Sequence, residues 1–247
     1  MTESEWLACA DPMLMLEFLI GPAEETFIVS AGDAVPWVDY PNKRISKRKE
    51  RLFACACCRR IWHLLTGERS RIARKALATA ELYAEGGSRR MMEEAHWLVN
   101  AVWVPRDVGL DAMAAFHFAT LAGSHIADAT CREAHNAIYR ESACSGEIES
   151  GLQCDVLRDI VGPLPFRQVT AVPLWLVWNN GTVRRIAEVI YAERQLPEGT
   201  FDNARLAILA DALEEAGCHD AEILAHCRSE GPHVRGCWAI DLILGKE

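Results

Sequence analysis

Six cysteine and histidine side chains near the C-terminus could bind a metal ion. They are Cys218, His219, His226, Cys227, His233 and Cys237. Zinc prefers thiolate sulfur and imidazole nitrogen as ligands. The spacing contains no C-x2-C pair and so matches no zinc-finger pattern. Free cysteines are also among the most buried residues, and burial in the core is the interpretation that the residue types favour. The alternative is a zinc site built from Cys218, His226, Cys227, His233 and Cys237.

A second set of potential ligands shares one face of a long helix expected over residues 111–144. It comprises His117, His125, Asp128, Cys131 and His135. At about 100° per residue, these positions fall within a wedge of about 120°. A di-iron bundle would need two Glu-x-x-His pairs, and only Glu93-x-x-His96 fits that pattern. The set is therefore a second metal candidate, with a polar packing face as the favoured alternative.

Cys55 and Cys58 form a C-x-x-C sequence within a run of small residues. Redox motifs of this type begin a helix, where the helix dipole lowers the thiol pKa. This one lies in the middle of an expected helix, with no strand before it. A stripe of small core residues is therefore the favoured interpretation.

The segment 43–75 is strongly basic in an acidic chain. It contains twelve Lys and Arg and two acids, so it carries +10, whereas the whole chain carries −9 and the remainder −19. Four arginines form a helical stripe: Arg44, Arg48, Arg51 and Arg59. Such a stripe could bind an anion or the phosphates of a nucleic acid. It could equally be a solvated face, or attract the acidic remainder of the fold.

Helix start and stop signals predict an all-α chain with an irregular assembly of about nine helices. The main helices are expected at residues 13–20, 47–66, 69–85, 89–102, 111–144, 154–161, 183–194, 204–216, 220–228 and 236–244. The one β element expected is a short strand at 26–30. We expect an N-terminal helical region at 1–144 and a C-terminal helical region at 145–247, which could also form one continuous domain.

Composition places the chain among ordinary globular proteins, since half of its 247 residues are hydrophobic and a quarter are charged. Its apolar runs are far shorter than the roughly 20 residues that span a bilayer. The first residues lack the positive segment of a secretory signal. These features predict a cytoplasmic protein without a membrane partner. The ten cysteines are then expected as free thiols.

The common catalytic motifs are missing from the sequence. It has no G-x-G-x-x-G, Walker, G-x-S-x-G or H-E-x-x-H motif. Tryptophan and arginine, which are enriched at protein interfaces, occur 8 and 21 times. The leading hypothesis is a non-catalytic interaction or regulatory module with a protein partner. A metal-binding protein or metal-dependent enzyme is the first alternative, and a nucleic-acid binder is the second.

Several stretches resemble a large group of uncharacterised bacterial paralogues. They are residues 1–7, 52–62, 157–160, 165–167 and 231–238. Within the chain, residues 204–217 (ARLAILADALEEAG) are similar to the repeat-companion domain, a helical module found beside repeat proteins. The resemblance implies a recurrent helical unit at the two ends and a variable middle. It implies no catalytic residue, and it suits an interaction module better than an enzyme.

Overall fold

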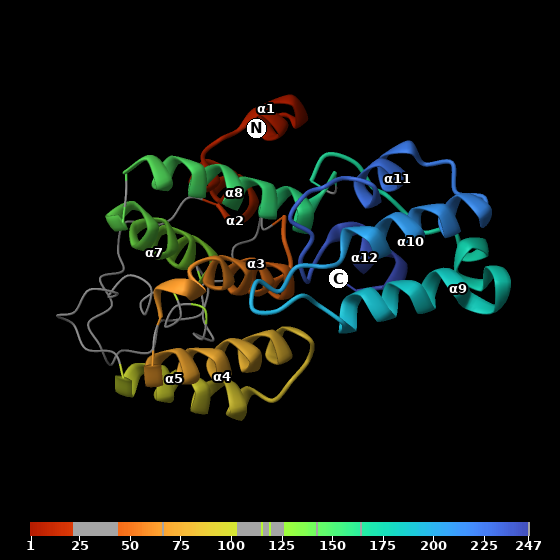
Figure 1. Cartoon of the computed structure of the whole chain (residues 1–247). Helices are drawn as coiled ribbons and strands as arrows, with labels where there is room; N and C mark the ends of the chain where they lie inside the picture. The colour runs from red at the N-terminus through yellow and green to blue at the C-terminus, as the bar shows by residue number, and fades with distance from the viewer. Residues whose placement is uncertain are drawn as a thin grey trace. The chain divides into compact units, whose positions relative to one another are not determined.

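The computed structural model describes residues 1–21, 44–65, 67–102, 115, 119, 126–141, 143–163 and 165–246 (Figure 1). Across these residues it contains eleven α-helices, one 3-10 turn and no strand, which confirms the predicted all-α fold. The strand expected at 26–30 lies outside the described residues. No helix in the described part of the chain is both long and apolar enough to cross a membrane.

The chain divides into two compact units, Met1–Cys154 and Asp155–Glu247. The division falls within a single helix, α8 (Ala143–Val161), which starts in the first unit and ends in the second. The boundary expected between residues 144 and 145 lies near the start of this helix.

The first three helices of the N-terminal unit begin at side-chain caps that the sequence carries. Thr2 and Glu5 form the predicted capping box, and Asp11 accepts a hydrogen bond from the amide of Met13 (2.8 Å). The elements are α1 (Glu3–Ala8), α2 (Pro12–Ile20), α3 (Lys47–Arg60), the 3-10 turn η1 (Trp62–Leu64), α4 (Gly67–Ala84), α5 (Arg89–Val102), α7 (Ile126–Glu141) and most of α8. Helix α4 packs beside α5, while α3 packs against α4 and α7 (Figure 1).

Helix α3 is buried along most of its length. Every residue from Lys49 to Cys58 is buried, and Cys55, Cys57 and Cys58 are free thiols inside the unit. Burial raises the pKa of Cys58 well above its ordinary value. A neutral, enclosed thiol is typical of a packing residue rather than a redox nucleophile.

Helix α8 differs from the prediction, which placed a short helix at 154–161 after an irregular stretch. The structure has one continuous helix from Ala143 to Val161. The buried side of its first half is formed by Gly146, Glu149 and Gln153, at helical spacing. Because these residues are not apolar, the sequence shows no hydrophobic periodicity there. Each is accommodated by a specific contact rather than by hydrophobic burial.

Glu149 and Gln153 obtain their hydrogen bonds from neighbouring helices. The guanidinium of Arg60 donates to both carboxylate oxygens of Glu149, at 2.8–3.1 Å. The thiol of Cys131 donates to the amide oxygen of Gln153 (2.9 Å), and the Gln153 amide donates to the Cys131 carbonyl (3.2 Å). These bonds let polar side chains occupy the core side of α8.

Replacing Glu149 with alanine should destabilise the N-terminal unit. The change removes the bidentate partner of Arg60, a loss expected to cost about 2 kcal/mol. The matched control is Glu93→Ala, which breaks an exposed ion pair with Arg89 at i,i+4 spacing and should change stability by about 0.5 kcal/mol or less. Urea unfolding of both variants measures the difference. Equal losses of unfolding free energy would show that the buried ion pair stabilises the unit no more than the exposed pair does.

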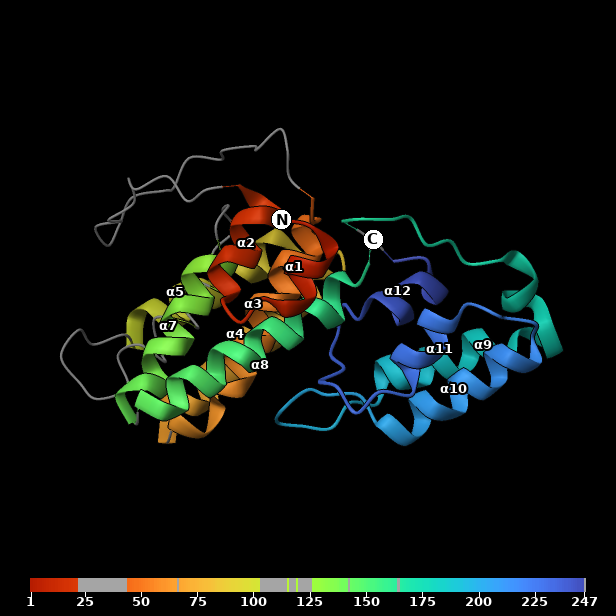
Figure 2. The same ribbon diagram turned by 90° about the horizontal axis from the view of Figure 1, so that it is seen from above.

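Four helices surround the core of the C-terminal unit. They are α9 (Pro173–Ala192), α10 (Asn203–Glu215), α11 (Ala221–Cys227) and α12 (Trp238–Leu244). Helix α10 contacts α9 and α11, and α12 contacts the same two helices, so the contacts form a closed ring (Figure 2). The core includes Phe201, Leu206, Leu209, Leu213, Trp238 and Ile240. Asp202 caps α10 and Asp220 caps α11 through bonds to backbone amides.

Helix α9 contains a break where the sequence predicts a turn. Asn179, Asn180 and Gly181 adopt left-handed backbone angles, with φ of 46°, 56° and 77°. Asparagine and glycine tolerate this region best among the residue types. The Thr182 hydroxyl then donates to the Asn179 carbonyl (2.7 Å). The helix predicted from residue 183 thus gains a preceding segment that starts at Pro173, with proline in the first turn.

Candidate metal centre

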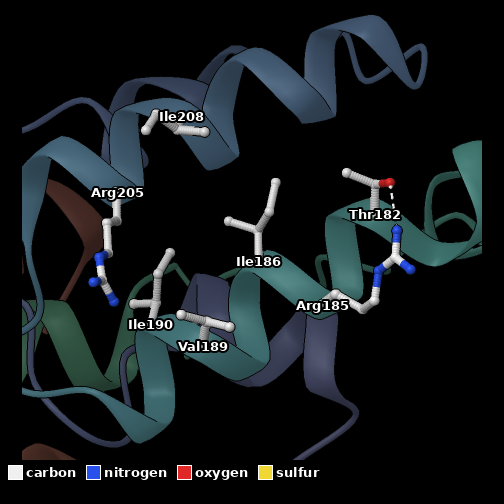
Figure 3. Close-up of a pocket in the computed structure, with 7 residues that line it drawn as sticks. All are labelled: Thr182, Arg185, Ile186, Val189, Ile190, Arg205 and Ile208. Carbon is white, nitrogen blue, oxygen red and sulfur yellow. Dashed lines mark hydrogen bonds between the residues drawn. The ribbon is translucent and has the colours of Figure 1, made fainter.

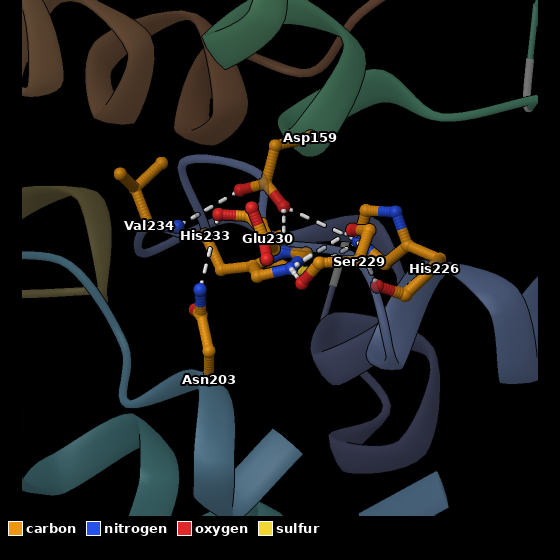
Figure 4. Close-up of polar contacts among 8 residues, drawn as sticks. Asp159, Asn203, His226, Ser229, Glu230, His233 and Val234 are labelled. Atoms are coloured by element: carbon orange, nitrogen blue, oxygen red, sulfur yellow. Dashed lines mark hydrogen bonds and ion pairs between the residues drawn. The ribbon is translucent and has the colours of Figure 1, made fainter. Parts of the chain in front are cut away.

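Four side chains that could ligate a metal converge inside the C-terminal unit. Asp159 lies in the last turn of α8, and His226 in the last turn of α11. His233 lies in the following loop, and Cys237 is the N-cap residue of α12. The potential ligand atoms of Asp159, His226, His233 and Cys237 all lie within 4.8 Å of one another. Figure 4 shows the Asp159 carboxylate directed towards the two histidines.

Backbone contacts hold the loop that carries His233. The His233 carbonyl accepts a hydrogen bond from the amide of Phe201 (2.7 Å), and the Asn203 amide donates to the carbonyl of Glu230 (3.0 Å). The amide of Val234 donates to Oδ2 of Asp159 (2.8 Å). These bonds fix the loop against the start of α10 and the end of α8, so the centre does not depend on flexible side chains alone.

Gly162, which follows the end of α8, leaves room for the indole of Trp238 beside the centre. Gly162 has a left-handed φ of +58°, and a Cβ added there would lie 2.4 Å from Cγ of Trp238. The indole also packs against the ring of His226, with centroids 5.0 Å apart. The close approach of backbone and indole at Gly162 therefore helps to set the position of α12 and of its N-cap, Cys237.

Gly162→Ala should therefore destabilise the C-terminal unit more than a strained backbone alone would. We expect a loss of about 2–3 kcal/mol, because the methyl group overlaps the indole of Trp238. Gly217→Ala is the matched control, since Gly217 is also left-handed (φ +87°) and has no atom within 4 Å of an added Cβ. That control should cost about 1 kcal/mol. Denaturant midpoints compare the two, and equal losses would contradict the packing argument.

Asp159 is a buried carboxylate between two imidazole rings. Its Oδ1 lies 2.8 Å from Nδ1 of His233 and 3.2 Å from Nε2 of His226. Burial by itself raises the pKa of Asp159, but the hydrogen bonds and positive charge of His226 and His233 outweigh it and lower the pKa. The carboxylate is therefore held in its charged form inside the unit, where a charge needs a compensating cation.

The hydrogen bonds of His233 indicate which of its two ring nitrogens carries the proton in a neutral ring. The Ser229 hydroxyl donates its hydrogen to the carbonyl of His226 (2.8 Å), so the hydroxyl oxygen can act only as an acceptor towards His233. Nε2 of His233 therefore lies 3.2 Å from two acceptors, the hydroxyl oxygen and the carbonyl oxygen of Ser229. Nε2 must then carry a proton. In a neutral ring, Nδ1 would present a lone pair to Asp159.

Two lone pairs 2.8 Å apart require a cation at this point, because oxygen and nitrogen would otherwise repel each other. The cation is either a second proton on His233 or a bound metal ion. Without a metal, burial by itself lowers the pKa of His233. The hydrogen bond to Asp159 and the negative charge of that carboxylate raise the pKa by more, so the net shift is upward. The centre therefore favours positive charge whichever cation supplies it.

Cys237 completes the set with sulfur. Its Sγ lies 3.2 Å from Nε2 of His226, the same distance that separates this nitrogen from Asp159. Burial, followed by the negative charge of Asp159, raises the pKa of the Cys237 thiol well above its ordinary value. The thiol is neutral when no cation is nearby, and a metal would convert it to the thiolate that ligates.

Three separations within this group, whose ligand atoms all lie within 4.8 Å of one another, can be compared with those of a tetrahedral zinc site. Zinc bonds of about 2.0–2.3 Å place neighbouring ligand atoms about 3.3–3.6 Å apart. The two 3.2 Å separations at His226 nearly meet this value. The 2.8 Å separation of His233 and Asp159 must widen by about half an ångström to admit the ion.

The structure brings together three of the five ligands proposed from the sequence. His226, His233 and Cys237 are in the centre, and Cys237 also belongs to the hydrophobic core of the unit. Cys218 and Cys227 lie in the same core but outside the four-residue group. Burial, followed by the nearby charge of Asp159, raises the pKa of Cys227 to about 12, as expected of an enclosed packing thiol. These two cysteines therefore fit the packing interpretation.

Asp159 was not proposed from the sequence, since it lies more than 60 residues before the other ligands. A signal was nevertheless present. Asp159 sits on the buried face of α8 among Val156, Leu157 and Ile160. A carboxylate on an apolar helix face needs a buried partner, and this requirement could have directed attention to the histidines.

The second set of metal candidates is only partly described. His117 and His125 lie outside the described residues, and Asp128 is described as part of α7 by its backbone alone. Cys131 bonds to Gln153, and Nδ1 of His135 lies 3.1 Å from the hydroxyl of Ser150. The described members therefore take part in packing between α7 and α8.

The predicted arginine stripe is engaged in contacts within the N-terminal unit. Arg48 pairs with Glu85 (2.9 Å) and Arg59 with Glu81 (2.7 Å). Arg51 donates to the carbonyl of Ala119 (3.0 Å), and the guanidinium of Arg44 lies over the ring of Phe18. Burial is the main cause that lowers the pKa of Arg51. Two of the four arginines therefore contact acidic side chains of the same unit, and the other two contact a backbone carbonyl and an aromatic ring.

No protein-family model, curated protein or solved structure matches this chain. The resemblance to the paralogue group and the repeat-companion domain therefore stays a prediction, and function is argued from the geometry of the centre.

Proposed function

We propose that this chain is a non-catalytic, zinc-binding helical protein in which Asp159, His226, His233 and Cys237 hold the ion. The observation that carries the proposal is the convergence of four ligand groups within 4.8 Å from three separate parts of the unit. Such a centre links the end of α8, the end of α11 and the start of α12. A metal bound there contributes its binding free energy to the stability of the unit.

The burial of the ligands supports a structural rather than a catalytic ion. Asp159, His233 and Cys237 are 3%, 1% and 0% exposed. Four protein ligands fill a tetrahedral zinc, whereas a catalytic zinc keeps one position open for water or substrate. The proposed ion would therefore have four protein ligands and no open coordination position, although the fourth ligand, His226, is only partly buried.

Outer hydrogen bonds also support a ligand role. A metal-binding histidine usually donates its second ring N–H to a carbonyl or carboxylate, as His233 does to Ser229. The Val234 amide holds the second oxygen of Asp159. These contacts orient the nitrogen and the carboxylate before a metal arrives, which lowers the cost of binding.

Cobalt substitution tests the proposed ligand set. Co²⁺ added to the metal-free chain should give the visible absorption of tetrahedral cobalt and a near-ultraviolet thiolate-to-cobalt band. Cys237→Ser should lose the thiolate band, whereas the matched control Cys227→Ser should keep it. A spectrum of octahedral cobalt, or loss of the band in the Cys227 variant alone, would refute this ligand set.

A cytoplasmic location is part of the proposal. The nine cysteines whose side chains the structure describes are free thiols, as expected in a reducing compartment. We keep the proposal that the partner is another protein, in preference to a nucleic acid, because the described stripe arginines have partners within their own unit.

A further inference from the structure

The four potential ligands of the metal centre differ in their exposure to solvent. The side chain of His226 is 16% exposed, whereas those of His233 and Asp159 are 1% and 3% exposed. Cys237 is fully buried. Solvent therefore reaches the centre on the side of His226, and the other three groups form its closed side.

The surface groove between α9 and α10 does not lead to these ligands. It has a volume of about 360 Å³ and a mainly aliphatic lining that includes Ile186 and Ile208 (Figure 3). None of the seven residues that line the groove belongs to the centre. An ion that approaches the ligands from solvent therefore meets the partly exposed edge of His226 first.

Asp159 and His233 are each held in place by an outer contact. The amide of Val234 donates to Oδ2 of Asp159 (2.8 Å). Nε2 of His233 lies 3.2 Å from both the hydroxyl and the carbonyl oxygen of Ser229. Contacts of this kind orient a metal ligand whether or not its bond to the ion is formed. We therefore expect these two ligands to stay in position while an ion enters or leaves.

His226 has no outer hydrogen bond of this kind. Its Nε2 faces the carboxylate of Asp159 and the thiol of Cys237, both at 3.2 Å. In the part of the chain that the structure describes, Nδ1 of His226 has no hydrogen-bond partner. The ring packs against the indole of Trp238 and the ring of His233, with centroids 5.0 and 4.8 Å apart. Rotation of the His226 side chain out of the centre would therefore break no outer hydrogen bond.

Charge also favours the departure of a histidine over that of the other ligands. With zinc bound, the carboxylate of Asp159 and the thiolate of Cys237 would together balance the two positive charges of the ion. Loss of either anion would leave an uncompensated charge inside the unit, which is costly. Histidine binds a metal as a neutral ring, so its departure leaves the charge balance unchanged. Of the two histidines, His226 is the more exposed.

We propose that His226 is the exchangeable ligand of the zinc centre proposed above, on which this inference rests, and that a small thiolate takes its place when zinc enters or leaves. Zinc prefers sulfur and nitrogen ligands, so a low-molecular-weight thiol suits the position that His226 gives up. The small opening beside His226 favours such a molecule over the cysteine of another protein.

The exchange step is a ligand substitution without electron transfer. The bond between zinc and Nε2 of His226 breaks, and a bond between zinc and the incoming sulfur forms. The incoming thiol releases its proton to solvent, and the His226 ring leaves as a neutral base. Asp159, His233 and Cys237 hold the ion during the substitution. The zinc content of the unit would then respond to the supply of small thiols as well as to the supply of zinc.

The first test measures zinc release from the loaded full chain to an excess of a coloured chelator, with mercaptoethanol as the small thiol. We expect the release rate to rise in proportion to the mercaptoethanol concentration, because sulfur replaces His226 before the ion leaves. Ethylene glycol is the matched control, since it carries a hydroxyl in place of the thiol, and it should leave the rate unchanged. A release rate that does not depend on mercaptoethanol would overturn the inference.

A variant then locates the exchange at His226. His226→Ala should still bind about one zinc from excess, since three ligands remain, but release it at least about tenfold faster, because loss of even an outer partner of a ligand costs about 10–100-fold in affinity. Free imidazole should slow this release by filling the open position from solvent. His219→Ala is the matched control, since His219 is exposed and lies outside the four-residue group, and it should release zinc as the natural chain does.

Three results with the folded His226→Ala chain, checked by circular dichroism, would overturn the inference and leave the zinc centre in place. A chain that retained no zinc would make His226 a permanent ligand. Release at the natural rate would show that His226 does not bind the ion, and release that ignores imidazole would show that solvent does not reach its position. Absence of zinc from the natural chain would instead refute the proposed function, and zinc content reveals it before any release is measured.

Discussion

Replacing Asp159 with asparagine should abolish zinc binding and cost the C-terminal unit about 3–5 kcal/mol. The change removes the buried carboxylate that faces His226 and His233, and breaking a buried ion pair by removing one partner carries a penalty of this size. It also replaces a proposed metal ligand with a weaker one. Urea unfolding gives the loss of stability, and zinc content gives the loss of metal.

The matched control for this variant is Asp155→Asn, one turn earlier on α8. Asp155 is half exposed and pairs with Arg158 on the surface of the same helix. Its loss should change stability by about 0.5 kcal/mol or less and leave zinc content unchanged. If Asp159→Asn proved as mild as this control, the carboxylate would not be the central group of the site.

Removing zinc should lower the thermal midpoint of the C-terminal unit by an amount on the order of 10 °C. A ligand present at about 1,000 times its dissociation constant stabilises the folded state by about 4 kcal/mol, and the chelator removes this contribution. Amide hydrogen exchange should rise most in α11 and α12, which carry His226 and follow Cys237.

The specificity of this effect can be checked with two cysteine variants. Cys237→Ala should unfold at the same temperature with and without chelator, because it lacks one ligand. Cys227→Ala removes a neighbouring buried thiol outside the centre, so it should lower the midpoint but retain its response to chelator. A natural chain whose midpoint ignores both chelator and added zinc would argue against a structural ion.

The sequence predicts most helices of this fold because their starts carry local signals. The capping box at Thr2 and the caps at Asp11, Ser46 and Asp220 lie where the polar side chains and the following apolar residues indicate them. These signals act over three or four residues, so no tertiary knowledge is needed to read them. The break in α9 at Asn180-Gly181 can be predicted in the same way, because its signal also lies in neighbouring residues.

The start of α8 could not be predicted in the same way. Its buried face carries Glu149 and Gln153, which are stable there only because Arg60 and Cys131 supply hydrogen bonds from other helices. Position 146 needs a glycine because Tyr139 packs over it. A Cβ added there would lie only 2.7 Å from Cδ2 of the Tyr139 ring. Tertiary contacts of this kind override local propensity and leave no periodic pattern.

The candidate site shows the same contrast between local and distant information. His226, His233 and Cys237 were found because they lie within 12 residues of one another. Asp159 is separated from His233 by 74 positions and enters the site only through the folding of α8 onto the loop. The residue types fixed the chemistry expected, but the number and identity of the ligands depended on the fold.

Zinc stoichiometry is the most direct test of the proposed zinc centre. The full chain would be purified without chelators, incubated with excess zinc, freed of unbound ion by gel filtration and measured by elemental mass spectrometry. We expect about one zinc per chain in the natural sequence and in Cys227→Ser, and almost none in Cys237→Ser. No retained zinc in the natural chain would contradict this expectation, and Asp159 and His233 would then form a buried ion pair held together by a proton.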